Sequence, residues 1–445
     1  MREKKIRIYI TLCVVFILLG VLFIPKVLYA NTSINKTKPV DAILSPYEML
    51  EDLDQLEKYI KRVHPSSKSG LDEDVSKAIQ NAYEKIDKPM TVGEYYFLLN
   101  EIVCKLGDAH TSIGVSGVNR IINVPIEYVE DKVVCTSESN VLKPGDIIVK
   151  LGDKDIDECI EYVKNNIPSE NIYWQNMLSP HYLKRELYLS RLGLIEDDKV
   201  TITYKRDVKE LKTTLPLEEV SYNQDNSFVE CEIYADEKTG IITIDKCLYN
   251  DEYKETLSNA FLEYASSDID TLVIDVRKNT GGSSRCLDEL ISYINVDEYK
   301  SYIGLIRGSW DGWIQRSSLI SHKTSNGIRK NTKKDSSLLF DGEIYVLTSG
   351  YTFSSGNWFG VILKDNNLAK IVGEPTGNKP TSYGDILRFP LDNSGIYLNM
   401  SYKEWLRPDT DKDDEDSLYP DVLIEKTIED VINSRDAVLE YILNN

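Results

Sequence analysis

Residues 345–358 read YVLTSGYTFSSGNW. The apolar run from Ile344 to Leu347 is typical of a buried strand, and the pattern over 355–364 predicts a helix after a short turn. Ser354 is therefore expected at a helix N-terminus, where free N–H groups and the helix dipole stabilise a developing negative charge. A hydroxyl there is placed like the serine of a nucleophile elbow. The simpler interpretation is that Ser354 only caps the helix.

A second segment, TLVIDVRKNTGGSS at 271–284, predicts a buried strand that runs into a glycine-containing turn. Gly281 and Gly282 allow backbone N–H groups to approach a ligand closely, which suits an oxyanion hole. We expect the polar residues of this segment to support that turn; they are Asp275, Arg277 and Asn279. A plain strand-to-helix turn or a phosphate loop is the alternative, although the full GxGxxG fingerprint is absent.

The third segment, CKLGDAHTSIG at 104–114, carries one of only four histidines in the chain. His110 follows directly on a predicted helix C-terminus, which favours the charged imidazole and suits a base that holds a proton in passing. A single histidine can equally be a surface or packed residue. His64, His181 and His322 have no comparable sequence context.

The order of patterns along the chain predicts an α/β protein with three folded parts. A mixed-sheet βα core follows an N-terminal helical subdomain and a PDZ-like β-rich domain. We expect the following divisions: an export signal or membrane anchor at 1–30, a linker at 31–44, the helical subdomain at 45–115, the PDZ-like domain at 120–217 and the catalytic-type core at 218–445.

Residues 1–30 place Arg2, Lys4, Lys5 and Arg7 before an apolar run over 8–24. This pattern fits a cleaved export signal as well as a retained anchor with its N-terminus inside the cell. In both cases the rest of the chain lies outside the cytoplasm, either tethered to the membrane or secreted.

Charge and cysteine spacing exclude several classes of partner. The formal net charge of −20 disfavours binding to nucleic acid. No CxxC pair occurs, so a structural zinc site is not expected, and spacing does not assign disulfides. The acidic run at 409–416 lacks the glycine and the distal glutamate of a calcium loop. We therefore expect no metal and no cofactor.

Taken in order, these segments resemble the tail-specific, or C-terminal processing, protease superfamily, which includes the tricorn core. The resemblance covers nearly the whole chain after the N-terminal segment. It rests on GDAHT, LKPGDIIVKLGDKDI, LVIDVRKNTGG, VLTSGYTFSSG, VGEPTGNK and LYPDV. It implies that Ser354 is the nucleophile, with the N–H groups of Ser355 and of a glycine in the NTGG turn, Gly281 by preference, as oxyanion donors.

The resemblance leaves two candidates for the general base. Lys379 falls where processing peptidases carry a lysine, but Pro380 follows it where glycine is usual, and Asn357 replaces a common glutamate. His110 falls where tricorn-type relatives carry a histidine, assisted by an acid that would be Asp414 or Glu415. We favour His110 because histidine acts near neutral pH without being desolvated.

The sequence therefore predicts a serine endopeptidase outside the cytoplasm, acting on protein or peptide substrates through an acyl-enzyme. The alternative is a member of the same fold that binds a ligand or peptide without cleaving it.

Overall fold

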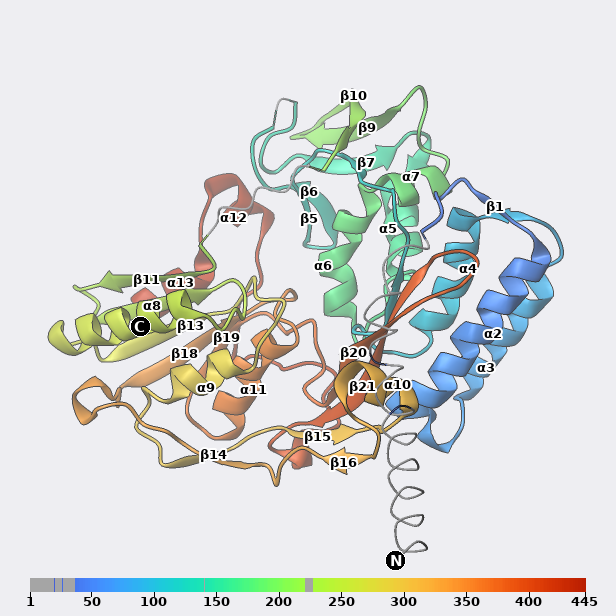
Figure 1. The fold of residues 1–445 in the computed structure, drawn as a ribbon. Helices are drawn as coiled ribbons and strands as arrows, with labels where there is room; N and C mark the ends of the chain where they lie inside the picture. Colours follow the sequence, from blue (N-terminus) through green and yellow to red (C-terminus); the bar gives the residue numbers. More distant parts are fainter. Residues whose placement is uncertain (1–19, 21–25, 27–36, 140, 221–226) are drawn as a thin grey trace, which may run out of the picture.

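The computed structural model describes residues 37–139, 141–220 and 227–445, together with Gly20 and Lys26. Figure 1 shows three regions side by side: long helices at one side, a β-rich unit at the top, and a sheet flanked by helices at the other side. This mixed architecture confirms the predicted α/β class.

The N-terminal region is a group of amphipathic helices, α2 (Pro46–Val63), α3 (Glu73–Lys85) and α4 (Val92–Cys104). The predicted capping boxes are present: the side chain of Ser45 accepts from the N–H of Glu48, and that of Thr91 accepts from the N–H of Glu94. A short η1 turn (Pro65–Ser69) follows α2, and β1 (Ile43–Leu44) pairs with β2 (Met90–Thr91). The helices bury their apolar stripes in one core.

Residues 120–219 form a second region, here called the intermediate unit. Its strands pair in the order β4-β10-β9-β7-β6-β5, with β8 on β7. The predicted hairpin over 199–217 is present as antiparallel β9 and β10. The strands are β4 (Arg120–Ile122), β5 (Ile126–Val129), β6 (Lys132–Cys135), β7 (Ile147–Leu151), β8 (Lys154–Asp155), β9 (Lys199–Arg206) and β10 (Lys209–Glu219). The helices are α5 (Ile156–Lys164), α6 (Ile172–Leu183) and α7 (Glu186–Arg191).

The third region is built on a sheet of order β11-β12-β13-β18-β19-β22, parallel except for the edge strand β11. Its strands are β11 (Val229–Tyr234), β12 (Thr239–Ile244), β13 (Thr271–Asp275), β18 (Glu343–Thr348), β19 (Lys370–Gly373) and β22 (Val422–Leu423). Successive side chains on a strand point to opposite faces. One face packs against α8 (Asp251–Ser266), α9 (Arg285–Ile291) and α11 (Ser355–Asp365); the other packs against α13 (Ala437–Leu443).

An antiparallel sheet connects this core to the helical region. Its order is β16-β15-β21-β20, and β3 (Ser112–Gly114), which follows α4, adds to β21. Thus the chain just after His110 is hydrogen-bonded to the core region. The remaining elements are β14 (Glu298–Lys300), β15 (Ile303–Ile306), α10 (Trp310–Arg316), β16 (His322–Lys323), β17 (Ile328–Lys330), η2 (Ser336–Leu338), β20 (Ser382–Pro390), β21 (Tyr397–Leu406), η3 (Thr410–Lys412) and α12 (Ile428–Asn433).

The predicted signal or anchor falls outside the described residues, apart from Gly20 and Lys26. Among the residues that are described, no helix has both the length and the apolar character needed to cross a bilayer. The six cysteines beyond residue 100 are all described, and all are free thiols.

Candidate active site

Ser354 lies between β18 and α11, as the strand–turn–helix pattern predicts. Its backbone has φ 53° and ψ −127°, outside the right-handed region, and its side chain makes no cap hydrogen bond. The structure therefore does not support the interpretation of Ser354 as a plain helix cap. Strain of this kind is typical of a nucleophile elbow.

The turn that holds Ser354 is fixed from both sides. The hydroxyl of Thr352 donates to the carbonyl of Val276 at 2.9 Å, which attaches the turn to the end of β13. The N–H of Ser354 donates to Oδ1 of Asn378 at 2.9 Å, and the amide of Asn357 donates to the carbonyl of Asn378 at 2.8 Å. Asn378 thus holds the strained backbone in place.

His110 is brought to this serine from a distant part of the sequence. It lies in the loop between α4 and β3, and its Nε2 is 3.0 Å from Oγ of Ser354. Burial lowers the pKa of His110 below its usual value, although the carboxylates of Asp108 and Asp385 oppose the shift. A lowered pKa favours the neutral form of the imidazole.

Asp108 orders the loop that carries His110. Its carboxylate is fully buried; it accepts the N–H of His110 at 2.9 Å, a ring nitrogen of His64 at 3.0 Å and the hydroxyl of Thr111. Its Oδ1 is 3.9 Å from Nδ1 of His110, which is too far for a hydrogen bond. Sequence reasoning gave His64 no role, because nothing local indicates its contact with residue 108.

The NTGG turn lies directly against Ser354. A Cβ added at Gly281 would meet Cβ of Ser354 at 2.6 Å, so only glycine fits. The N–H of Gly281, however, donates to Oδ1 of Asn279 at 2.8 Å. In this structure the Gly281 N–H is thus engaged by Asn279, and its role as the preferred oxyanion donor stays a prediction. Gly282 and Ser355 both line the cavity at Ser354, and within the described residues neither N–H donates a hydrogen bond.

Asn279, Asp275 and Arg277 occupy supporting positions. The side chain of Asn279 bonds to the carbonyl of Ile244 at 2.8 Å, and its own carbonyl accepts the N–H of Phe353 at 2.9 Å. Arg277 forms ion pairs with Asp275 at 2.6 Å and with Asp436 at 2.8 Å. These contacts connect the ends of two parallel strands to the turn of Ser354 and to the N-terminus of α13.

The other candidate residues do not converge on Ser354. Within the described part of the chain, the ammonium of Lys379 makes no hydrogen bond or ion pair with Ser354 or with any other side chain. Glu415 pairs instead with Arg407 at 2.6 Å, and among the described residues no hydrogen bond or ion pair joins Asp414 to His110. Arg407 is itself fully buried between Glu415 and Asp365, so this acidic segment serves to bury a guanidinium.

The intermediate unit contributes residues that the sequence did not indicate. Trp174 on α6 stacks on Phe353 with ring centroids 4.3 Å apart, and Phe353 lies 4.6 Å from the ring of His110. Glu170, just before α6, places a carboxylate oxygen within 4.8 Å of a carboxylate oxygen of Asp108 and a ring nitrogen of His110. Glu170 lies in a loop with no motif, so no local signal identified it.

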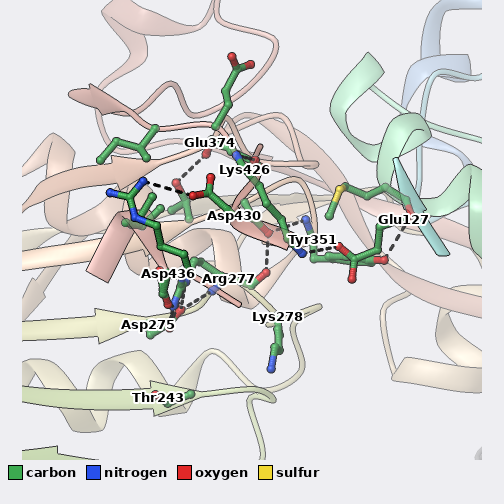
Figure 2. Close-up of a pocket in the computed structure, with 18 of the residues that line it drawn as sticks. Glu127, Thr243, Asp275, Arg277, Lys278, Tyr351, Glu374, Lys426, Asp430 and Asp436 are labelled. Atoms are coloured by element: carbon green, nitrogen blue, oxygen red, sulfur yellow. Dashed lines mark hydrogen bonds and ion pairs between the residues drawn. The ribbon is translucent and has the colours of Figure 1, made fainter. Parts of the chain in front are cut away.

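Two cavities flank the turn. The smaller, of about 90 Å³, is lined by His110, Gly282, Ser354 and Ser355. The larger, of about 390 Å³, lies at the carboxyl ends of the parallel strands, between the core and the intermediate unit. Figure 2 shows Arg277 between Asp275 and Asp436 in this larger cavity, and Lys426 reaching toward Glu127. Neither Ser354 nor His110 lines it.

The segment that contains this turn matches a known family. Residues 238–424, which include the NTGG turn and Ser354, match the model of peptidase family S41. This match confirms the predicted resemblance to the tail-specific proteases over residues 238–424. A comparison with curated proteins finds no match.

Solved structures agree with this assignment at the level of the fold. Mature CPAF in complex with lactacystin has a TM-score of 0.69 and 14% identity, over 89% of this chain and 97% of that one. Mature CPAF alone gives 0.67 and 13%, over 89% and 96%. A candidate peptidase from Parabacteroides merdae gives 0.50 and 15%, over 90% and 96%. At such identities the likeness establishes the fold alone.

Proposed function

We propose that this protein is a serine endopeptidase that works outside the cytoplasm and hydrolyses peptide bonds through an acyl-enzyme on Ser354, with His110 as the general base. The observation that carries the proposal is the 3.0 Å approach of Nε2 of His110 to Oγ of Ser354 across 244 residues of sequence. The location rests on the basic and apolar pattern of residues 1–30.

The chemistry follows from the arrangement of these groups. Oγ of Ser354 attacks the peptide carbonyl carbon while Nε2 of His110 takes the hydroxyl proton. The oxyanion accepts hydrogen bonds from the N–H groups of Ser355 and Gly282. His110 then gives its proton to the leaving amine, and the acyl-enzyme forms. A water molecule gives a proton to His110 and attacks the ester carbon. As the bond from that carbon to Oγ breaks, His110 returns the proton to Oγ of Ser354 and the carboxylic acid product leaves.

The test is covalent labelling by a fluorophosphonate probe. Purified full-length protein in mild detergent should label, and the Ser354→Ala variant should not. His110→Ala should label at least about 100-fold more slowly, as loss of a general base implies. Lys379→Ala should label at the wild-type rate. If the wild-type protein does not label, the proposal fails and a binding role without cleavage gains support; loss of labelling in Lys379→Ala alone would make lysine the base.

A further inference from the structure

Several buried polar atoms around the candidate nucleophile have no hydrogen-bond partner. They include Nδ1 of His110, Oε2 of Glu170 and the amide nitrogen of Asn378. Buried polar atoms are rarely left unpaired, because they lose their bonds to water on folding. In a serine peptidase, moreover, the ring nitrogen that faces away from the serine must carry its hydrogen, so that the nitrogen facing the serine can accept one.

Glu170 and His110 are neighbours at the site. A carboxylate oxygen of Glu170, one of Asp108 and a ring nitrogen of His110 all lie within 4.8 Å of one another. Catalytic hydrogen bonds are often long in a free enzyme and shorten when substrate binds.

We propose that Glu170 is the positioning residue of His110: its carboxylate accepts the hydrogen on Nδ1 and so holds Nε2 toward Ser354 as a proton acceptor. This inference rests on the proposed function and names a residue of the intermediate unit as part of the same site. Glu170 thus takes the role of the assisting acid, which the resemblance in the sequence had suggested for Asp414 or Glu415.

Asp108 is the alternative partner of Nδ1, but both of its oxygens already accept hydrogen bonds. Its Oδ1 accepts the N–H of His110, and its Oδ2 accepts His64 and Thr111. Its Oδ1 lies 3.9 Å from Nδ1 of His110, which is beyond hydrogen-bond length. Oε2 of Glu170, by contrast, has no hydrogen bond of its own, and Oε1 accepts the N–H of Ala109 at 3.3 Å. The side-chain amide of Asn378, whose nitrogen also lacks a partner, is the second group that this carboxylate faces.

The loop of Glu170 is fixed to the core by the next residue. The amide nitrogen of the Asn171 side chain donates to the carbonyl oxygens of Thr376 at 3.1 Å and Asp416 at 2.9 Å. Its Oδ1 accepts the N–H of Trp174, which caps α6. Glu170 is therefore held at the site by bonds that do not involve its own carboxylate.

The arrangement predicts a specific dependence on pH. Burial, and after it the charge of Asp108, raises the pKa of Glu170 to about 8. The titratable groups that face Glu170 are Asp108 and His110, both in the α4–β3 loop. The segment after β19 adds only the neutral side-chain amide of Asn378. Asp385, on β20, acts on His110. The pair Glu170–His110 therefore titrates as a unit.

The two protonation states of this pair differ in whether Nε2 of His110 can accept a proton from Ser354. With Glu170 protonated, its hydrogen is donated to Nδ1 and the ring hydrogen lies on Nε2, which cannot then take a proton from the serine. When the pair loses one proton, Nδ1 carries the ring hydrogen, Glu170 is ionised and Nε2 is free to accept. Reactivity of Ser354 should therefore rise as the pair loses that proton.

The experiment compares full-length wild type with Glu170→Gln, and with Glu158→Gln as the control, since Glu158 is an exposed glutamate on α5 of the same unit. Between pH 7 and pH 9 the rate of fluorophosphonate labelling of wild type should rise about tenfold, as ionisation near pH 8 implies. Glu170→Gln should show no such rise and should label about 100-fold more slowly at pH 9. The control should follow wild type.

A second readout does not depend on activity. In ¹⁵N-histidine NMR spectra, the signals of His110, identified by their loss in His110→Ala, should show hydrogen on Nδ1 in wild type at pH 9. The hydrogen should move to Nε2 as the pH falls to 7. A purely structural role of Glu170 would move neither this signal nor the pH profile of labelling.

The outcomes separate the two proposals. An unlabelled wild type refutes the proposed function, and the NMR titration still decides the role of Glu170. Equal rates and equal pH profiles in wild type and Glu170→Gln overturn the positioning role. So does a change of the wild-type signal when bound metal is removed by EDTA, because the three side chains would then be a cation site. If the variant does not fold, the titration of wild-type His110 alone decides, and hydrogen on Nε2 at pH 9 overturns the inference.

Discussion

Trp174 of the intermediate unit stacks on Phe353, the residue before the candidate nucleophile, with ring planes inclined by only 19°. Phe353 in turn contacts the ring of His110. A buried aromatic pair of this kind adds to the free energy of unfolding and also fixes the turn it covers. The intermediate unit thus packs directly against the candidate catalytic turn.

Removing this aromatic contact should affect stability and reactivity together. Trp174→Ala should lower the free energy of unfolding by about 3–5 kcal/mol, as for other buried large-to-small changes. It should also slow labelling of Ser354, since Phe353 and His110 lose their support. Urea unfolding and labelling kinetics measure the two effects. Trp310→Ala, on the exposed face of α10, is the control and should change neither the free energy of unfolding nor the labelling rate by much. Unchanged labelling in Trp174→Ala would refute the link between this aromatic contact and the reactivity of Ser354.

The bond from Ser354 to Asn378 should matter more for reactivity than for stability. Asn378→Ala removes the acceptor of the Ser354 N–H. The free energy of unfolding should fall by about 1–3 kcal/mol, the usual cost of an unpaired buried group. The elbow should relax, so kcat for a peptide substrate should fall while KM changes little. Asn295→Ala, at an exposed site, provides the comparison; a change confined to KM would contradict the predicted role.

Alanine substitutions at Gly281 and Gly70, which have similar φ, distinguish the effect of backbone strain from the effect of a steric clash with Ser354. Gly281 has φ 104° and Gly70 has φ 119°, but an added Cβ meets Ser354 at 2.6 Å only at Gly281. Gly70→Ala, with open space around it, should lower the free energy of unfolding by about 1 kcal/mol and leave labelling intact. Gly281→Ala should abolish labelling, because the methyl group displaces Ser354. Similar labelling of both variants would show that the turn adapts.

The buried pair of Asp108 and His64 should make stability depend on pH. Burial opposes ionisation of Asp108, but the hydrogen bond from His64 and the charges of His64 and His110 outweigh it and hold the pKa well below its usual range. A lowered acid pKa stabilises the fold above the unfolded value of about 3.9 and loses that contribution as the pH falls through the folded value.

Asp108→Asn should therefore lower the free energy of unfolding by about 2 kcal/mol at pH 7, with a smaller difference from wild type at pH 3. Urea titrations at the two pH values measure this. Asp297→Asn, at a surface ion pair, should show almost no difference at either pH. A deficit of Asp108→Asn that is the same at pH 3 and pH 7 would argue against an ionised Asp108.

The sequence predicted the local features of the site better than its assembly. Ser354 could be placed because a strand, a turn and a helix are adjacent in the chain, and His110 because it follows a helix end. The bond of the Gly281 N–H to Asn279 could not be predicted, since it depends on a turn conformation that composition does not specify. Glu170 and His64 carry no motif, and Asn378 lies in the VGEPTGNK segment without a role of its own there. The contacts of all three arise only when distant segments fold together.

The two hydrogen bonds from the Asn171 side chain to the carbonyl oxygens of Thr376 and Asp416 join the loop of Glu170 to the core. Because the side chain of Asn171 is buried, this contact persists only while the intermediate unit and the core stay packed together. Separation of the two would take the carboxylate of Glu170 away from His110.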